Sequence, residues 1–204
     1  MKNKVIFFGD SIIRYKYKKE IFDWTLNFKK LLKFYQKQNN HFKTYSYIGL
    51  NSNQAVKLLP NILKKNKKIE TLVIQIGIND SWHFKSLKGK ANVNSLKFKK
   101  NLKIIFTKSK YYKIKNLVFM TYHRILKNRL EINNKTINQN LMKYIKIIRN
   151  FCKHKKILCI DIYNDTKKIN PNNMCLKLPD GIHLSKKGTY VYSKIVYKKL
   201  EKFL

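Results

Sequence analysis

Thr71-Leu72-Val73-Ile74-Gln75-Ile76 is an almost unbroken apolar stretch that ends at Gly77. Short runs of this kind, rich in β-branched residues and closed by glycine, are typical of strands buried on both faces of a sheet. The same character recurs along the chain, in Lys4–Gly9, Phe42–Ile48, Asn116–Thr121 and Lys156–Ile162. We therefore predict five strands, and they determine the fold class.

Segments with apolar residues at helical spacing separate the predicted strands. These segments are Lys18–Gln38, Ser52–Lys65 with Asn51 or Ser52 as its cap, a helix after Asn92 that runs to about Ser109, Asn133–Lys153 and Ser185–Phe203. Asp80–Asn92 and Tyr163–Pro179 are expected to be loops. Regular alternation of buried strands with helices predicts a mainly parallel sheet covered on both faces. The expected architecture is a three-layer α/β/α fold in a single domain, residues 1–204, with its ligand beyond the carboxyl ends of the strands.

The composition indicates a globular protein without a membrane span. The chain has 204 residues, of which 44% are hydrophobic, so a sizeable core can form. The first apolar run, Val5–Gly9, is too short for a signal peptide. No run approaches the roughly 20 apolar residues that a membrane helix needs. We expect a cytoplasmic protein.

The formal net charge of +36 is extreme, and such a charge favours polyanionic partners. Two features indicate compositional drift instead. Only four of the 46 basic residues are arginine, and the lysines are scattered over every segment, whereas a nucleic-acid site concentrates arginine and aromatic residues in one patch. Lysine is also accompanied by many Asn, Ile, Tyr and Phe residues, which share A/T-rich codons. A nucleic-acid partner is therefore not expected.

Four groups of small or polar residues follow the predicted strands or precede the last helix. They are Gly9-Asp10-Ser11, Gly49 with Asn51 and Ser52, Gly77-Ile78-Asn79-Asp80, and Asp180-Gly181-Ile182-His183. Four of the chain's six glycines lie in these groups. Glycine permits positive φ angles and close approach of the backbone. The clustering therefore indicates a site built from tight turns.

The residue types in these groups suit nucleophilic catalysis. A serine hydroxyl needs a base to remove its proton, and His183 can exchange protons near neutral pH. Asp180, three residues earlier, can orient the imidazole, which leaves the other ring nitrogen for Ser11. The backbone amides of Ser11 and Gly49 and the side-chain amide of Asn79 could form an oxyanion hole. In the alternative interpretation, Ser11 is a helix cap and Asn79 only shapes a turn.

This order of motifs resembles the SGNH hydrolases, also called the GDSL lipase/acylhydrolase superfamily. The resemblance extends from Gly9 to Gly188. It implies Ser11 as nucleophile, Gly49 and Asn79 in the oxyanion hole, and Asp180 with His183 completing the triad. It also implies a flavodoxin-like fold with a five-stranded parallel sheet, and neither metal nor cofactor.

Two stretches, DGIHLSKKG and GLNSNQAVKLLP, are similar to the esterase branch that hydrolyses isoamyl acetate. The chain departs from the family after the GDS motif. It has Ile12-Ile13-Arg14 where the family often has Leu or Ile followed by Thr. Because Arg14 is expected near the mouth of the pocket, the substrate preference of the family is not carried over to this chain.

Several neighbouring residues have open roles. Asp10 is expected to bond turn amides rather than act as a second acid. His83 and His123 follow strands on the functional side and could touch substrate, and Trp82, Phe84 and Tyr122 could line an acyl pocket or pack under a lid. The three cysteines show neither disulfide nor zinc spacing.

The sequence predicts a serine-dependent hydrolase of carboxylic esters, acting on a small-molecule, carbohydrate or lipid ester. The same triad could serve an acyltransferase, a thioesterase or a lysophospholipase. A catalytically retired protein that binds polyanions is the remaining alternative. The intact set of site residues argues against that alternative.

Overall fold

The computed structural model describes residues 4–35, 41–83, 89–127 and 135–204. Its centre is a five-stranded sheet in the order β4-β1-β5-β6-β7, and all neighbouring strands are parallel. The strands are β1 (Lys4–Gly9), β4 (His41–Ser46), β5 (Thr71–Gln75), β6 (Asn116–Met120) and β7 (Leu158–Ile160). This confirms the predicted flavodoxin-like sheet. All five predicted strands are present, with small shifts at their ends.

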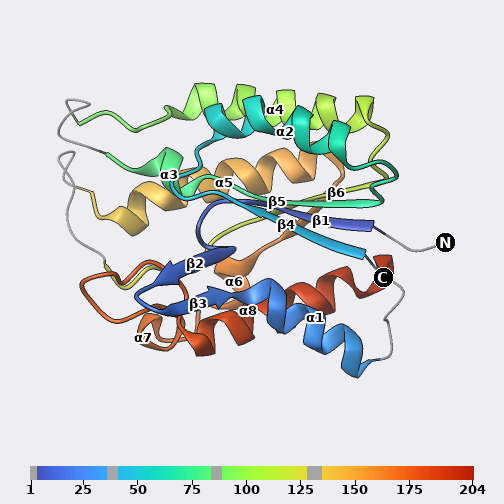
Figure 1. Cartoon of the computed structure of the whole chain (residues 1–204). Coiled ribbons are helices and arrows are strands. Elements are labelled where there is room, and N and C mark those ends of the chain that lie inside the picture. Colours follow the sequence, from blue (N-terminus) through green and yellow to red (C-terminus); the bar gives the residue numbers. More distant parts are fainter. Residues whose placement is uncertain (1–3, 36–40, 84–88, 128–134) are drawn as a thin grey trace.

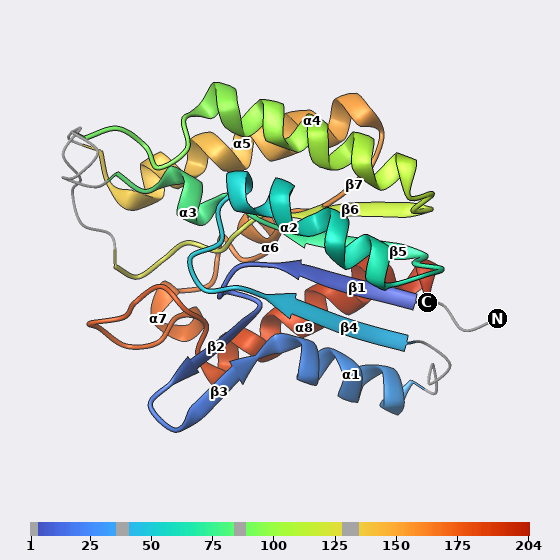
Figure 2. The ribbon, with the colours of Figure 1, turned by 45° about the horizontal axis from the view of Figure 1, so that its top comes forward.

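Helices cover both faces of the sheet (Figures 1 and 2). One face carries α2 (Ser52–Lys65), α4 (Ser95–Tyr111) and α5 (Ile137–Lys155), and the other carries α1 (Trp24–Phe34) and α8 (Lys186–Leu200). Alternate side chains of β1 point into the two cores. Val5 and Phe7 join the core under α1 and α8, while Ile6 and Phe8 join the core under α2 and α4. The predicted three-layer α/β/α architecture is confirmed.

The predicted helix Lys18–Gln38 is wrong in its first part. Two antiparallel strands, β2 (Arg14–Tyr17) and β3 (Glu20–Asp23), precede the helix and form a hairpin. Asp23 ends the hairpin, because its carboxylate accepts a hydrogen bond from the backbone amide of Thr25 and caps α1. The hairpin lies beside the loops at the carboxyl ends of the strands (Figure 1).

The two predicted loops contain short helices. Asp80–Asn92 overlaps the end of α3 (Ile78–Ser81), and Tyr163–Pro179 overlaps α6 (Ile162–Asp165) and contains α7 (Pro171–Met174). The last helix ends at Leu200 and is followed by a 3₁₀ turn, Glu201–Phe203. Within the described ranges, no helix combines the length and apolar character needed to cross a membrane.

Candidate active site

Ser11, His183 and Asp180 meet in a continuous hydrogen-bonded relay. The Oγ of Ser11 lies 2.9 Å from Nε2 of His183, and Nδ1 of the same ring lies 2.8 Å from Oδ2 of Asp180. Ser11 lies two residues after the end of β1, whereas the other two residues precede α8. The fold therefore joins residues that are 172 positions apart in the sequence. The imidazole is held at both nitrogens, as a base that serves a hydroxyl must be.

The turn that carries His183 is fixed by Asp180. Its Oδ1 accepts the backbone amides of Ile182 and His183, which leaves Oδ2 for the imidazole. Burial raises the pKa of this carboxyl, but the hydrogen bonds from His183 and from the two amides outweigh burial and lower the pKa to about 2. Asp180 is therefore a carboxylate near neutral pH.

Gly181 is required in the same turn. Its φ of +62° falls in the left-handed region, and an added Cβ would lie 2.9 Å from the backbone nitrogen of Lys127. That nitrogen donates a hydrogen bond to the carbonyl of Gly181. The turn and the segment after β6 are thus packed backbone against backbone, which leaves no room for a side chain.

A hydrogen bond links Asn79 to the turn that contains Gly49. The amide of Leu50 bonds the carbonyl of Tyr47 and closes a turn in which Gly49 has a φ of +72°. The side-chain amide of Asn79 donates to the carbonyl of Leu50 at 3.0 Å. Because an amide nitrogen carries two hydrogens, one N–H of Asn79 remains for another acceptor. The amide of Tyr47 bonds the carbonyl of Gly9 and links this turn to the end of β1.

Asp10 is fully buried directly before Ser11. Its carboxyl accepts hydrogen bonds from the amide of Ile12 and from the hydroxyl of Tyr122. Burial raises the pKa of Asp10 to about 7, against the lowering effect of these two bonds. Asp10 thus bonds a turn amide, as predicted, and shapes the segment that carries Ser11. Tyr122 has no exposed surface, so the structure excludes it from lining an acyl pocket.

Asp80 connects three helices beneath the Gly49 turn. Its carboxyl accepts the amide and the hydroxyl of Ser52, at the start of α2. Asn101 of α4 donates to the same hydroxyl at 2.8 Å. Burial raises the pKa of Asp80 to about 6. This network could not be predicted from local sequence patterns, because Asp80 and Ser52 are separated by 28 positions.

His123 is not a substrate contact. It is fully buried, and its ring nitrogens lie 2.7 Å from the hydroxyl of Tyr192 and 3.0 Å from the carbonyl of Ile182. Burial lowers its pKa to about 4, so the ring is neutral near pH 7. It supports the backbone next to His183 from the protein interior.

Tyr15 is the main site neighbour that the sequence analysis missed. Its ring stacks on the imidazole of His183 from the β2–β3 hairpin. The alternating pattern of Arg14-Tyr15-Lys16-Tyr17 is a strand signal, but the helical interpretation of the following residues obscured it. Burial first, and the nearby Asp180 carboxylate second, raise the pKa of the Tyr15 phenol.

The other candidates fall outside the relay. Arg14 pairs with Asp23 across the hairpin at 3.8 Å, whereas His83 lines a cavity beside α4. Phe84 lies outside the described residues. The three cysteines are free. Among the side chains that the structure describes, no three His, Cys, Asp or Glu residues group to hold a metal ion.

Comparison with known proteins assigns the family. The model of the GDSL-like lipase/acylhydrolase family matches residues 5–195, nearly the whole chain. The protein therefore belongs to this family of esterase-type hydrolases, as its motifs predicted. No curated protein sequence matches it. The similarity to the isoamyl-acetate branch stays a prediction.

Solved structures agree with this fold. A lipase/acylhydrolase from Enterococcus faecalis superposes with a TM-score of 0.79 at 17% identity, covering 99% of this chain and 97% of the other. Axe2, an acetylxylan esterase from Geobacillus stearothermophilus, gives a TM-score of 0.77 at 16% identity, with 97% and 94% covered. At such identities the likeness shows the shared fold.

Proposed function

We propose that this protein hydrolyses carboxylic esters by a serine mechanism. The observation that carries the proposal is the relay from Asp180 through His183 to Ser11, with bonds of 2.8 and 2.9 Å. These are the distances over which a general base can take a proton from a nucleophile. Family membership supports ester hydrolysis as the reaction class.

The first half of the reaction forms an acyl-enzyme. Oγ of Ser11 attacks the carbonyl carbon of the ester while Nε2 of His183 takes the serine proton. Asp180 stabilises the imidazolium that forms. The tetrahedral intermediate collapses as His183 passes this proton to the departing alcohol.

The second half regenerates the enzyme. His183 removes a proton from water, the hydroxide attacks the acyl carbon, and the serine leaves with the proton returned by His183. In both halves the oxyanion is stabilised by the amides of Ser11 and Gly49 and by the side chain of Asn79. The free N–H of Asn79, beside the Gly49 turn, fits this role.

Ser11→Ala tests the proposal. We expect turnover of p-nitrophenyl acetate to fall by a factor of about 10³ or more. A fluorophosphonate should label Ser11 in the wild type and fail to label the variant. Ser109→Ala is the control, because Ser109 is a buried serine near the end of α4 whose hydroxyl donates a hydrogen bond to the backbone carbonyl of Ile105. Wild-type turnover by a folded Ser11→Ala protein would disprove the mechanism.

The acyl acceptor and the substrate class form the finer part of the proposal. Water is the proposed acceptor, and a small-molecule, carbohydrate or lipid ester is the proposed substrate. Product analysis with a competing alcohol distinguishes hydrolysis from acyl transfer. Thioester and lysophospholipid substrates tested in parallel distinguish thioesterase and lysophospholipase activity.

A further inference from the structure

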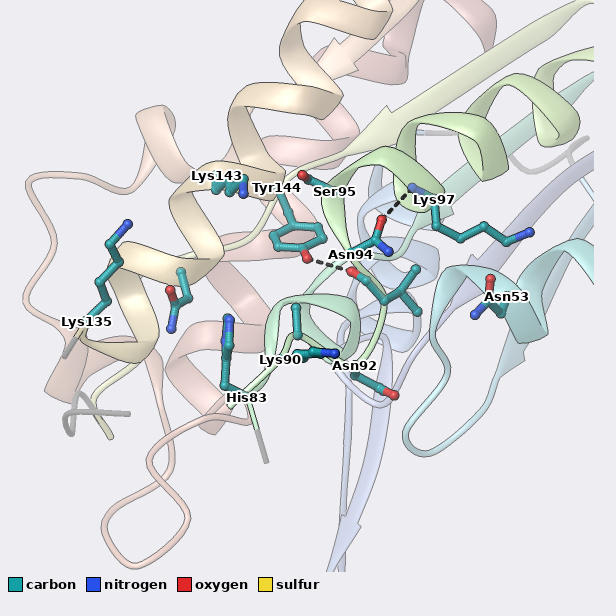
Figure 3. A pocket seen from close by; sticks show the side chains of 13 residues that line it. Asn53, His83, Lys90, Asn92, Asn94, Ser95, Lys97, Lys135, Lys143 and Tyr144 are labelled. Atoms are coloured by element: carbon teal, nitrogen blue, oxygen red, sulfur yellow. Dashed lines mark hydrogen bonds between the residues drawn. The ribbon is translucent and has the colours of Figure 1, made fainter. Parts of the chain in front are cut away.

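A cavity of about 420 Å³ lies between the start of α2, the segment before α4 and the first turns of α5 (Figure 3). Four lysines line it, and they are Lys90, Lys97, Lys135 and Lys143. None of the described lining residues is acidic. Lysine is abundant over the whole chain, so the lysines alone do not distinguish this cavity from other surfaces.

Two asparagines give the cavity a more specific character. The Oδ1 of Asn53 accepts a bond of 2.8 Å from Asn101, and the Oδ1 of Asn94 accepts a bond of 2.9 Å from the backbone amide of Lys97. The side-chain oxygens of both asparagines are thus already hydrogen-bonded within the protein. The NH₂ ends are left as donors.

One backbone acceptor in the cavity wall, the carbonyl of Val93, is already hydrogen-bonded within the protein. The hydroxyl of Tyr144 donates a hydrogen bond to the backbone carbonyl of Val93. The buried carboxyl of Asp80 bonds Ser52 and does not line the cavity. Cationic and amide donors therefore dominate the lining, which suits a ligand that carries several acceptor oxygens.

The cavity adjoins the proposed oxyanion hole. Asn92, which lines the cavity, donates its side-chain amide to the backbone carbonyl of Asn79 at 3.0 Å. Asn79 in turn bonds the carbonyl of Leu50 beside the Gly49 turn. One hydrogen bond thus separates the cavity wall from a residue of the candidate active site.

We propose that this cavity is an anion-binding site for a carboxylate or phosphate group. Two sources present that chemistry: a charged portion of the ester substrate or a free anion. The first source rests on the proposed function, whereas the second is independent of it.

Asn53→Asp is the sharpest test. The variant keeps an oxygen for Asn101 and replaces the NH₂ donor by a charged acceptor. We expect the wild type to bind inorganic phosphate saturably when the titration is monitored by calorimetry. A salt concentration of about 0.15 M screens the surface charges. We expect Asn53→Asp to weaken it by roughly tenfold or more. Asn172→Asp, an exposed residue of α7 outside the cavity, makes the same charge change and should bind as the wild type does.

Lysine variants test the contribution of charge with matched controls. Lys97→Gln and Lys143→Gln should each weaken phosphate binding. Lys100→Gln and Lys153→Gln, at exposed positions of the same two helices outside the cavity, should not. Absence of saturable binding by the wild type, or equal losses in cavity and control variants, would overturn the proposal.

Kinetics identify the source of the anion. If it belongs to the substrate, Asn53→Asp should raise KM for p-nitrophenyl succinate and leave KM for neutral p-nitrophenyl acetate unchanged. If it is free, phosphate binding should weaken while both KM values stay constant. Phosphate titration of Ser11→Ala keeps the test independent of catalysis, so failure of the proposed function and failure of this site are distinguishable.

Discussion

The ring of Tyr15 lies flat against the imidazole of His183, with centroids 3.4 Å apart and planes 4° apart. The β2–β3 hairpin that carries Tyr15 is also linked to the start of α8 by an ion pair of 3.1 Å between Glu20 and Lys186. Tyr15 therefore covers one face of the histidine and restricts rotation of its ring. Because it acts through His183, Tyr15 is a positioning residue in the proposed mechanism.

Replacement of Tyr15 tests this relationship. Tyr15→Ala should lower kcat for p-nitrophenyl acetate by about two- to tenfold, since aromatic pairs contribute about 0.5–1.5 kcal/mol. Tyr15→Phe keeps the stacked ring and should restore most of the activity. Tyr190→Ala, an exposed tyrosine of α8, is the control for general loss of an aromatic ring. Equal activity of Tyr15→Ala and wild type would contradict the positioning role.

Asp180→Asn should reduce kcat by about 10³–10⁴-fold. Asparagine can still accept the amides of Ile182 and His183, but it cannot stabilise an imidazolium as a carboxylate does. Steady-state kinetics measure the loss, and thermal unfolding checks that the variant is folded. Asp165→Asn makes the same charge change at a residue that pairs with Lys199 and should retain activity. If kcat of Asp180→Asn fell by less than tenfold, the proposed role of Asp180 in the relay would be wrong.

Gly188→Ala should destabilise the protein, although alanine is the better helix former by about 1 kcal/mol. A Cβ at this position of α8 would lie 2.1 Å from the carbonyl oxygen of Met174. We expect the free energy of unfolding to fall by about 1–3 kcal/mol, measured by urea denaturation. Lys198→Ala, at an exposed position of the same helix, should change it by less than about 0.5 kcal/mol. A stabilised Gly188→Ala protein would show that α8 moves freely away from Met174.

Asp10→Asn should alter the dependence of stability on pH. Burial raises the pKa of Asp10 from 3.8 to about 7, so the folded protein holds this proton more tightly than the unfolded chain. The stabilising contribution is fully present below about pH 4 and is lost as the pH rises through about 7. Asparagine has no proton to lose. The variant should therefore gain stability relative to wild type as the pH rises from about 4 to 7.

Urea denaturation of both proteins across this range measures the effect. Groups that titrate in both proteins contribute equally to the two free energies of unfolding, so their contributions cancel in the difference. Asp80 is one such group, because burial raises its pKa as well. A constant difference between the two free energies of unfolding would contradict the raised pKa of Asp10.

Most of the sheet could be predicted because its signal is local. Lys4–Gly9, Thr71–Gln75 and Asn116–Met120 are short and almost wholly buried runs, and a strand buried on both faces needs little else in its sequence. The hairpin was missed for the opposite reason. Ile21 is half exposed, and its spacing from Trp24 and Phe28 suits a helix, so periodicity alone could not show that Asp23 separates the hairpin from α1.

The positions of the strands, the family motifs and the candidate residues Ser11, Asp180 and His183 could all be recognised from the sequence. How these three residues meet follows from the packing of the folded chain. The bond from His183 to Ser11, the ring of Tyr15 on His183 and the orientation of Asn53 by Asn101 all join distant segments of chain. Local sequence patterns report the preferences of neighbouring residues, whereas these contacts depend on how the packed helices and sheet place separate segments against one another.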